Sequence, residues 1–415
     1  MKILIVASNY PDQAYPISGI FNESSVLSLQ ELGHEVEVFA PRPFAPPVLS
    51  EWVARWKRYR SLPNFEIRRG VKVHRPPYFQ MPYFANALSV DWFAFLSTFQ
   101  LASSRHKTVE FDGILSFDLI GTAVMSWRLG RRLGLPTVGW ITGHAPQSPS
   151  IRKVMTKALS QLDAVYYQSR ETLKEGAELL QVPMTEMASR GHTVLPRGIP
   201  SPPSFSRSDL RRHYRREWGI ADDEIVIMNV GRISRSKGIL ELLEALSRSA
   251  RSNSKIRGVL IGSVPSLDDS HVVLKKLGEE PWLGARVKLL PACARDRVWE
   301  YLCAADIFAF TSPQEGMPNS LLEAMAMKIP VVAFDIPPVR EAEGQTGGVV
   351  LVKVGDVARL ADALGQLAVN HGRREDVARR GVQVVKERFN MVSNMATAVQ
   401  CLLQLAEKRK SGAAA

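Results

Sequence analysis

The chain has 415 residues, of which 45% are hydrophobic and 23% are charged, a composition that excludes a largely disordered protein. The length exceeds what one hydrophobic core usually serves, so we expect two domains. The three cysteines are odd in number and lack metal-ligand spacing, which indicates reduced thiols in a cytoplasmic protein.

The 53 Lys and Arg residues exceed the 41 Asp and Glu residues and give a formal net charge of +12. This excess favours anionic partners, such as nucleotide phosphates, polyphosphate-linked lipids or an anionic membrane surface. Nucleic acid would suit the charge too, but the chain has no helix-turn-helix, zinc-finger or RNA-binding signature, so we expect no nucleic acid. The best candidate for a membrane span, residues 90–102, is shorter than the required length of about 20 residues. We therefore predict a cytoplasmic protein, with peripheral association at the inner face of an anionic membrane as a further hypothesis.

The first half of the chain alternates short apolar runs with stretches that can form helices. Residues 2–7 (KILIVA) predict a buried strand rather than a signal peptide, because the run is short and no cleavage site follows it. Residues 22–32 predict a helix that Gly33 ends, and residues 35–40 predict the next strand. Further strands are expected at residues 113–116, 137–141 and 164–168.

The second half repeats this alternation. A strand is predicted at residues 224–230, followed by a basic loop and an amphipathic helix at residues 239–247. Further strands are predicted at residues 258–262, 287–290, 307–310 and 331–334. Strands that alternate with helices predict a parallel sheet with helices on both faces, so each half is expected to form an α/β domain.

Residues 200–208 (PSPPSFSRS) have the composition of a linker between these halves. We therefore predict a Rossmann-like domain at residues 1–200 and a second one at residues 201–390. A helix at about residues 391–415 is expected to pack back on the first domain. In such folds ligands bind beyond the carboxyl ends of the strands, so we expect the site in a cleft between the two sheets.

The most specific segment is residues 315–323 (EGMPNSLLE), which follow a predicted strand and open a helix at Ser320. Glu315 and Glu323 flank a turn and a helix N-terminus, where free backbone N–H groups point outward. This arrangement suits a sugar nucleotide, with Glu315 on sugar hydroxyls and Glu323 on ribose hydroxyls. Two alternatives stay open: Ser320 and Glu323 also fit a capping box, and Glu315 also fits a solvated loop acid.

The loop from Gly231 to Gly238 (GRISRSKG) lies between a predicted strand and a predicted helix. A diphosphate bound there would gain the charges of Arg232 and Lys237 and the positive end of the helix. The spacing is not a Walker P-loop, because the glycine-rich half is missing. Arg235 is an additional cation without an assigned role, and a solvated basic turn is the alternative interpretation.

These segments together resemble the retaining family-4 glycosyltransferases (glycosyltransferase group 1), whose GT-B fold has two Rossmann-like domains with parallel sheets facing a central cleft. The resemblance rests on Glu315 and Glu323 with seven residues between them and on the AMAMKIPVVAFD that follows. It extends over nearly the whole chain, through SGIFNESSVLSLQELGHEVEVFAPRP near the start, VLPRGIP before the linker and MNVGRISRSKGILELLEAL after it. It implies an enzyme that moves a sugar from a nucleotide-diphosphate sugar to the hydroxyl of a sugar or lipid-linked acceptor.

The resemblance further implies retention at the anomeric carbon and a role in cell-surface polysaccharide or glycoconjugate biosynthesis. We expect neither a metal nor another cofactor, because cations of the basic loop can stabilise the leaving group and no D-x-D carboxylate pair is present. The expected catalytic residues are His144, Arg232, Lys237 and Glu315. The expected donor-binding residues are Gly19, Gly231, Arg232, Lys237, Glu315, Gly316, Met317, Asn319, Ser320 and Glu323. In the family, the loop that contains Gly19 closes over the diphosphate, although a plain turn glycine is an open alternative.

His144 follows a predicted strand and resembles the histidine that lies beside the donor sugar in the family. The family pattern continues with a glycine and then an aspartate, whereas residues 145–147 of this chain are Ala-Pro-Gln. Gln147 therefore leaves the acidic position unfilled. Lys328 and Pro337-Pro338 also replace glycines that are usual in the family, so loop shapes can differ there.

Residues 51–60 (EWVARWKRYR) place Trp52, Trp56 and Tyr59 at helical spacing among basic residues. Such a helix can lie on an anionic membrane, and its aromatic stripe can equally pack on the protein itself. Residues 75–84 (RPPYFQMPYF) add aromatic side chains near the place where an acceptor would enter. We interpret this region as a candidate lipid-facing or acceptor-facing surface.

Two other functions stay open at this point. A related fold carries out nucleotide-sugar 2-epimerisation, which would turn over without any acceptor. A non-catalytic nucleotide-sugar-binding subunit would fit the altered residues after His144, but the presence of Glu315, Glu323, Arg232 and Lys237 argues against it.

Overall fold

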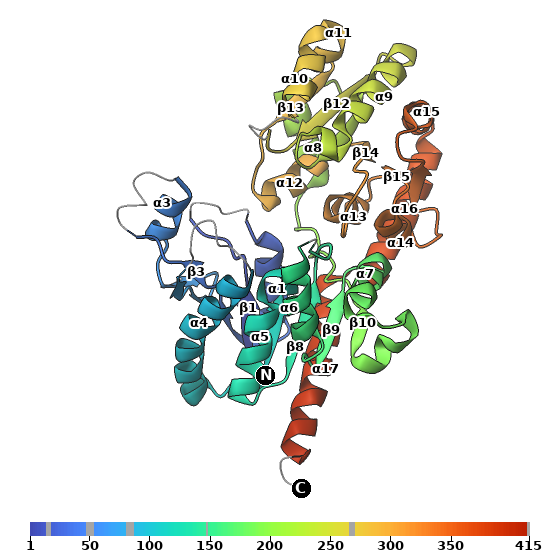
Figure 1. Cartoon of the computed structure of the whole chain (residues 1–415). Coiled ribbons are helices and arrows are strands. Elements are labelled where there is room, and N and C mark those ends of the chain that lie inside the picture. The colour runs from blue at the N-terminus through green and yellow to red at the C-terminus, as the bar shows by residue number, and fades with distance from the viewer. Residues whose placement is uncertain (14–17, 47–53, 80–86, 147, 265–269, 413–415) are drawn as a thin grey trace. The chain divides into compact units, whose positions relative to one another are not determined.

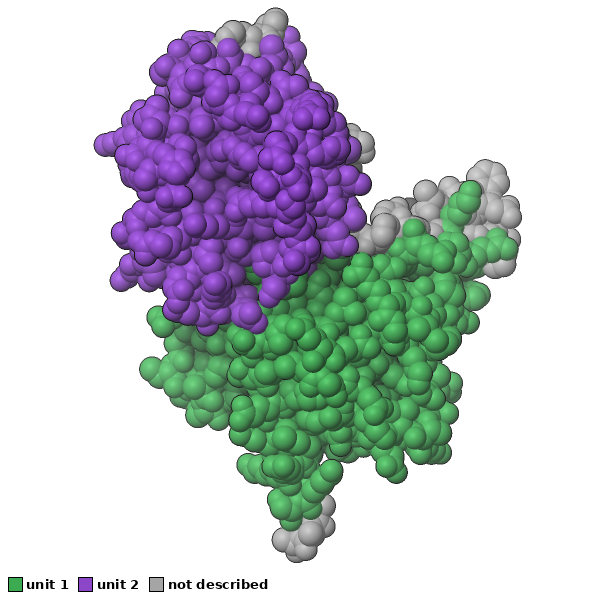
Figure 2. All heavy atoms as spheres, turned by 180° about the vertical axis from the view of Figure 1, so that it is seen from behind, with its two compact units in different colours: residues 1–200, 391–415 green, residues 201–390 purple. Residues whose placement is uncertain are grey.

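The structure is a computed structural model of the chain, and it describes residues 1–13, 18–46, 54–79, 87–146, 148–264 and 270–412 (Figure 1). The chain forms two compact units, Met1–Pro200 with Met391–Ala415, and Ser201–Asn390 (Figure 2). The chain enters the second unit at Ser201, in the Pro- and Ser-rich segment, and returns to the first unit at Met391. These are the boundaries that the sequence analysis gives for the two domains. Within the described residues, no helix combines the length and the apolar composition that crossing a bilayer requires.

An eight-stranded sheet forms the centre of the first unit, with the strand order β10-β9-β8-β7-β1-β2-β5-β4. Neighbouring strands pair in parallel except β4, which pairs antiparallel with β5. The strands are β1 (Lys2–Ala7), β2 (Glu35–Phe39), β4 (Phe65–Arg68), β5 (Val71–His74), β7 (Gly113–Phe117), β8 (Thr137–Ile141), β9 (Ala164–Tyr167) and β10 (His192–Val194). A short parallel ribbon of β3 (Arg42–Pro43) and β6 (Pro77–Tyr78) follows β2 and β5 along the chain.

Helices cover both faces of this sheet. Ile3 and Ile5 of β1 point into a core that α1 and α17 cover, whereas Leu4 and Val6 point into a core that α4 and α5 cover. Successive side chains of a strand point to opposite faces, so the unbroken apolar run of β1 is what a strand buried on both faces requires. The helices of this unit are α1 (Ile20–Glu31), α3 (Ala54–Ser61), α4 (Ala87–Val109), α5 (Leu119–Leu133), α6 (Pro149–Leu159), α7 (Arg170–Leu180) and α17 (Met391–Gly412).

The C-terminal helix α17 is part of the first unit. The Met391 amide donates to the Ile199 carbonyl at 3.0 Å. Further along the helix, Leu402 packs so closely on Gly113 of β7 that a β-carbon at this glycine would lie 2.7 Å from the leucine side chain. This close packing is the return to the first domain that the sequence predicts.

The second unit is built on a six-stranded parallel sheet with the order β13-β12-β11-β14-β15-β16. Its strands are β11 (Ile225–Val230), β12 (Ile256–Ile261), β13 (Val287–Leu290), β14 (Ile307–Phe310), β15 (Val331–Phe334) and β16 (Val349–Val352). Its helices are α8 (Arg207–Trp218), α9 (Ile239–Ser252), α10 (Ser270–Glu279), α11 (Pro281–Gly284), α12 (Arg295–Leu302), α13 (Asn319–Ala326), α14 (Pro337–Glu343), α15 (Val357–Val369) and α16 (His371–Arg388).

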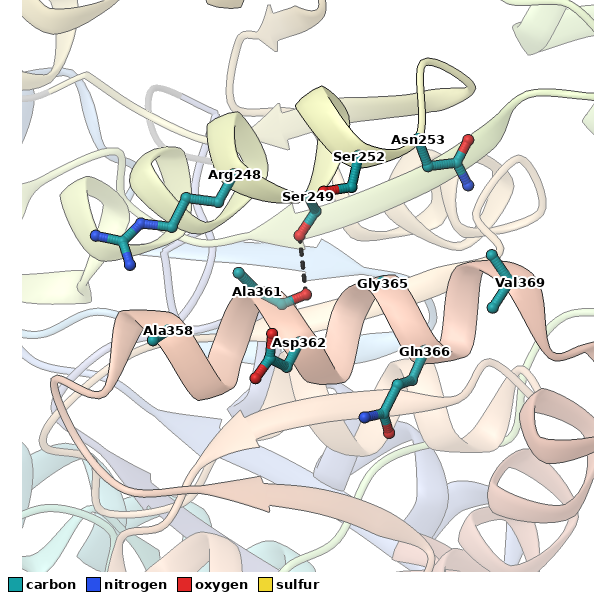
Figure 3. A pocket seen from close by; sticks show the side chains of 10 residues that line it. All are labelled: Arg248, Ser249, Ser252, Asn253, Ala358, Ala361, Asp362, Gly365, Gln366 and Val369. Carbon is teal, nitrogen blue, oxygen red and sulfur yellow. Dashed lines mark hydrogen bonds between the residues drawn. The ribbon is translucent and has the colours of Figure 1, made fainter.

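Helices α9 and α15 pack side by side on one face of this second sheet. The Ser249 hydroxyl donates to the Ala361 carbonyl at 2.9 Å, beside a pocket between the two helices (Figure 3). Because α9 runs back from the carboxyl end of β11, its C-terminal residues lie toward the amino ends of the strands. The pocket is therefore not where a parallel sheet binds ligands.

The strand order reverses once in each sheet. In the first unit the chain passes from β1 to β2 on one side and later places β7 on the other side of β1. In the second unit it passes from β11 to β12 and later places β14 on the other side of β11. Loops that leave neighbouring strands in opposite directions open a crevice at the carboxyl ends, and ligands of α/β proteins bind there. The segments singled out in the sequence follow β1, β8, β11 and β14.

Candidate active site

Two loops of the second unit meet beyond β11 and β14. The loop after β11 ends in a short 3₁₀-helix at Arg235–Lys237 and in Gly238, whose φ of +67° is left-handed. A β-carbon at Gly238 would lie 1.9 Å from the Thr311 carbonyl oxygen, so glycine alone fits this contact. The Thr311 hydroxyl also donates to the Lys237 carbonyl at 3.2 Å. These contacts hold the basic loop against the start of the β14 loop.

Lys237 and Glu315 face each other across this junction. The Lys237 Nζ lies 2.5 Å from the Glu315 Oε1, and the side chains are 23% and 20% exposed. The structure thus brings a predicted diphosphate-binding cation and the predicted sugar-binding carboxylate into contact at the point where the strand order reverses. Glu315 is not a freely solvated loop acid.

Arg232 and Arg235 are exposed on the same basic loop. Among the residues that the structure describes, neither forms an ion pair with a carboxylate, in contrast to Lys237. Gly231 precedes them, and its amide donates to the Ile261 carbonyl at 3.0 Å, which fixes the start of the loop beside β12. The loop therefore presents the exposed guanidinium groups of Arg232 and Arg235 next to the Lys237–Glu315 pair.

Helix α13 begins one residue earlier than predicted. It runs from Asn319 to Ala326 with Pro318 at the N-cap position, and no side chain caps its N-terminus. The capping-box alternative for Ser320 and Glu323 is therefore wrong. Gly316, Met317, Asn319 and Ser320 are half-buried, whereas Leu321 and Leu322 are fully buried. The uncapped backbone N–H groups at this helix end follow Glu315 closely along the chain.

Glu323 is buried inside the second unit, where it pairs with Arg295 of α12. The Arg295 Nε and Nη2 lie 2.9 and 2.8 Å from the same carboxylate oxygen, and the two side chains are 8% and 7% exposed. Burial raises the pKa of Glu323, and the neighbouring Arg295 guanidinium acts in the opposite direction. The sequence analysis missed Arg295, which holds the Glu323 carboxylate in place. Binding of ribose hydroxyls by Glu323 stays a prediction.

In the first unit, Gly19 lies at the N-cap of α1 with a φ of +78°. A β-carbon here would lie 2.7 Å from backbone atoms of Asn9, and the Asn22 side chain donates to the Asn9 carbonyl at 2.6 Å. The turn by itself thus requires glycine, which is the plain-turn interpretation. Donor binding by Gly19 stays a prediction.

His144 lies in the loop after β8. Its Nδ1 is 2.7 Å from Glu175 Oε1, and the Ala145 amide donates to Glu175 Oε2 at 2.8 Å. Glu175 belongs to α7 and carried no signal in the sequence, because a glutamate on a helix is usually a solvated side chain. Gln147, the position at which the family pattern has its acid, lies outside the described residues.

Asp118 ties three strand ends together beneath this loop. It follows β7 with a left-handed φ of +65°, and it accepts hydrogen bonds from Ser8 after β1 (3.1 Å) and Thr142 after β8 (3.2 Å). A non-glycine residue in this conformation is uncommon and costs energy, so the contacts of the carboxylate help to hold it. Sequence reasoning missed this residue as well.

The aromatic and basic stretch is described in part. Trp52 lies outside the described residues, and the helix α3 presents exposed Lys57 and Arg60. Among the described residues, no group of three or more His, Cys, Asp or Glu has the arrangement that could hold a metal ion.

Residues 211–384, which contain the basic loop, Glu315 and Glu323, match the family model described as Glycosyl transferases group 1. The chain is a glycosyltransferase with a group 1 domain. It is similar to TuaC of Bacillus subtilis (strain 168), a glycosyltransferase assigned to teichuronic acid biosynthesis, with 27% identity over 95% of this chain and 96% of the relative. The lipopolysaccharide core biosynthesis glycosyltransferase LpsE of Rhizobium meliloti (strain 1021) is 29% identical over 40% of this chain and 46% of its own length.

Solved structures show the same fold for the glycosyltransferase. Sucrose-phosphate synthase from Thermosynechococcus elongatus superposes with a TM-score of 0.73 at 18% identity, over 98% of this chain and 99% of that one. HepE of Anabaena, solved in complex with UDP, superposes with a TM-score of 0.69 at 19% identity, over 97% of this chain and 99% of that one. The fold is thus the α/β GT-B fold with its two Rossmann-like domains, as the sequence predicts.

Proposed function

We propose that this glycosyltransferase uses a nucleotide-diphosphate sugar and transfers the sugar to an acceptor hydroxyl in cell-surface polysaccharide or glycoconjugate biosynthesis. The observation that carries the proposal is the contact between Lys237 and Glu315 at the strand-order reversal of the second sheet. The Lys237 ammonium and the Glu315 carboxylate lie side by side there, and we propose that they bind the donor diphosphate and the sugar hydroxyls. HepE, which shares the fold, was solved with UDP and with UDP-glucose, and TuaC and LpsE are named for teichuronic acid biosynthesis and lipopolysaccharide core biosynthesis.

The leaving group determines what the basic loop does in this reaction. When the acceptor oxygen attacks the anomeric carbon, the bond from that carbon to the diphosphate oxygen breaks and negative charge grows on the diphosphate. In this proposal Arg232, Lys237 and the N–H groups at the start of α13 stabilise that charge. We propose that these groups make a metal ion unnecessary.

Glu315 orients the donor sugar in this proposal rather than attacking it. Its carboxylate contacts the Lys237 ammonium at 2.5 Å, and an ion-paired oxygen is a weaker nucleophile than a free one. We propose that the acceptor attacks from the face that the diphosphate leaves, with a leaving-group oxygen taking the acceptor proton, so that the configuration is retained. The anomeric proton coupling of the product in an NMR spectrum tests this point, and an inverted product would contradict it.

For the acceptor, the first unit offers aromatic side chains beyond its sheet. The Phe44 amide donates to the Tyr78 carbonyl at 2.7 Å, so the ends of β3 and β6 lie together, and Phe44 and Phe79 are 49% and 52% exposed. Exposed Lys57 and Arg60 belong to the same unit. We propose a lipid-linked acceptor whose anionic and apolar parts meet these groups at the cytoplasmic face of a membrane.

Donor binding and turnover test the proposal in sequence. A thermal-shift screen with UDP-glucose, UDP-galactose, UDP-N-acetylglucosamine and GDP-mannose should raise the Tm with at least one of them, because binding to the folded state alone stabilises it. Glu315→Ala should then abolish transfer, and full turnover by this variant would rule out the assignment. Turnover to a 2-epimer without an acceptor would instead support an epimerase.

A further inference from the structure

One carboxylate clamps both the ring and the backbone of the His144 loop. The two oxygens of Glu175 accept one hydrogen bond each, from the His144 Nδ1 side at 2.7 Å and from the Ala145 amide at 2.8 Å. The side chains of His144 and Glu175 are 33% and 24% exposed, so the clamp is partly shielded from water. A helix residue 31 positions away thus fixes both the loop and the imidazole.

The clamp also decides which ring nitrogen carries the proton. An ionised carboxylate can accept hydrogen bonds but cannot donate them, so His144 Nδ1 must be the protonated nitrogen. Nε2 is then the nitrogen with a lone pair in the neutral ring. This Nε2 atom is shielded from solvent and has no hydrogen-bond partner among the residues that the structure describes. A buried polar atom without a partner is rare and is explained when a ligand supplies the missing bond.

The other end of the same loop is anchored as well. The Thr142 hydroxyl donates to Asp118, two residues before His144, and Glu175 binds the amide directly after it. Anchors on both sides leave the imidazole little freedom to turn. Such preorganisation matters for a hydrogen bond that has to be in place when charge develops on a reacting sugar.

We propose that Glu175 is a positioning residue of the transfer reaction, which holds His144 as the Nδ1–H tautomer and presents Nε2 as a hydrogen-bond acceptor to a hydroxyl of the donor sugar. The inference rests on the proposed function, since it takes the ligand of His144 to be the donor. Glu175 does not touch the reacting atoms and acts through His144.

The variant Glu175→Gln should change the tautomer of His144, which a mere loss of packing would not do. If the amide oxygen keeps the Ala145 N–H, the amide NH₂ group faces Nδ1 and can only donate to it. His144 then has to move its proton to Nε2, where it no longer accepts. A two-bond ¹H–¹⁵N NMR spectrum of the ligand-free protein, with the His144 signals identified by their loss in His144→Ala, should show Nδ1–H in the wild type and Nε2–H in the variant. An unchanged tautomer overturns the proposal.

Kinetics test the catalytic part with the nucleotide sugar that gives the largest Tm shift in the donor panel. Glu175→Gln should lower kcat for release of the nucleoside diphosphate by about 10- to 100-fold, the range expected for loss of one hydrogen bond involving a charged group. The matched control is Glu178→Gln on the same helix, where the side chain is exposed, and it should leave kcat unchanged.

A double-mutant cycle then separates positioning from a structural role. Since Glu175 acts through His144, the double variant Glu175→Gln/His144→Ala should be no slower than His144→Ala alone. Additive losses would show that Glu175 acts elsewhere and overturn the proposal. If no nucleotide sugar is turned over by the wild type, the proposed function fails, while the tautomer measurement still supports or refutes the Glu175 clamp.

Discussion

Replacing Arg295 with methionine would leave the Glu323 carboxylate buried without its cation. The two side chains are 8% and 7% exposed and their charged atoms lie 2.8 Å apart, so water cannot take over the role of the guanidinium. Removing one partner of a buried pair typically costs about 3–5 kcal/mol of unfolding free energy. We expect Arg295→Met to destabilise the second unit by this order of magnitude at pH 8.

The loss of unfolding free energy in Arg295→Met should grow as the pH rises. Burial already raises the pKa of Glu323, and Arg295 is the group that opposes this shift, so the pKa should rise further in Arg295→Met. A carboxyl group with a raised folded pKa keeps its proton in the folded state while the unfolded chain releases it. Stability therefore falls as the pH rises above the unfolded value of about 4.3, by up to about 1.4 kcal/mol per pH unit. The variant should be closest to the wild type near pH 5.

Urea unfolding at pH 5 and pH 8, followed by circular dichroism, measures both effects. The control is Arg295→Met/Glu323→Gln, which removes the buried charge together with its partner and should recover a large part of the loss at pH 8. If Arg295→Met loses less than about 1 kcal/mol at pH 8 and shows no pH dependence, Arg295 does not compensate the Glu323 charge. The reasoning from the geometry would then be refuted.

Three further outcomes are expected. Lys237→Met should lower kcat/KM for nucleotide release by about 10²- to 10³-fold, because this cation would face the negative charge that grows on the diphosphate. The control is Arg216→Met at an exposed position, and equal kcat/KM values for Lys237→Met and the wild type would contradict the role of Lys237. Hydrogen bonds from His74, Arg105 and Lys72 outweigh burial and lower the pKa of Glu37 to about 2. The unfolding free energy should therefore decrease as the pH falls from 5 toward 2, which urea unfolding measures. An equally steep decrease in the Glu37→Gln variant would contradict this assignment. Lys328 has a left-handed φ of +55°, so Lys328→Gly should raise the unfolding free energy by up to about 1 kcal/mol in urea titrations and Lys328→Val should lower it.

The sequence predicts the central strands well because their signal is local. The apolar run at residues 2–7 is observed as β1, and the predicted strand at residues 307–310 is observed as β14 with the same bounds. The β4–β5 hairpin was missed, because its turn uses Arg69 and Gly70, both with positive φ, and an arginine gives no sign of that conformation. Strand β4 is also an edge strand with partly exposed side chains, and in both β4 and β5 polar residues interrupt the apolar ones.

The candidate site shows where prediction from one sequence ends. Lys237 and Glu315 could be placed together, because each follows a strand of a parallel sheet and the carboxyl ends of such strands meet at one edge. The residues that hold Glu323 and His144 in place could not be predicted. Arg295 and Glu175 lie 28 and 31 positions from the residues that they hold, on helix faces that usually bear solvated charges. Tertiary packing alone turns them inward.

The departures from the family pattern are met by local geometry rather than by loss of the site. Lys328 adopts the left-handed backbone that a glycine would have, and Pro337 and Pro338 occupy the first turn of α14, where their missing N–H groups are not needed. The loop after His144 is the most informative case. The acidic residue that the pattern places in this loop is absent from the sequence, yet a carboxylate reaches the loop from α7 and binds the Ala145 backbone. An acid supplied from a helix is carried by a rigid element, so it can hold the imidazole with less freedom than an acid in the loop itself could.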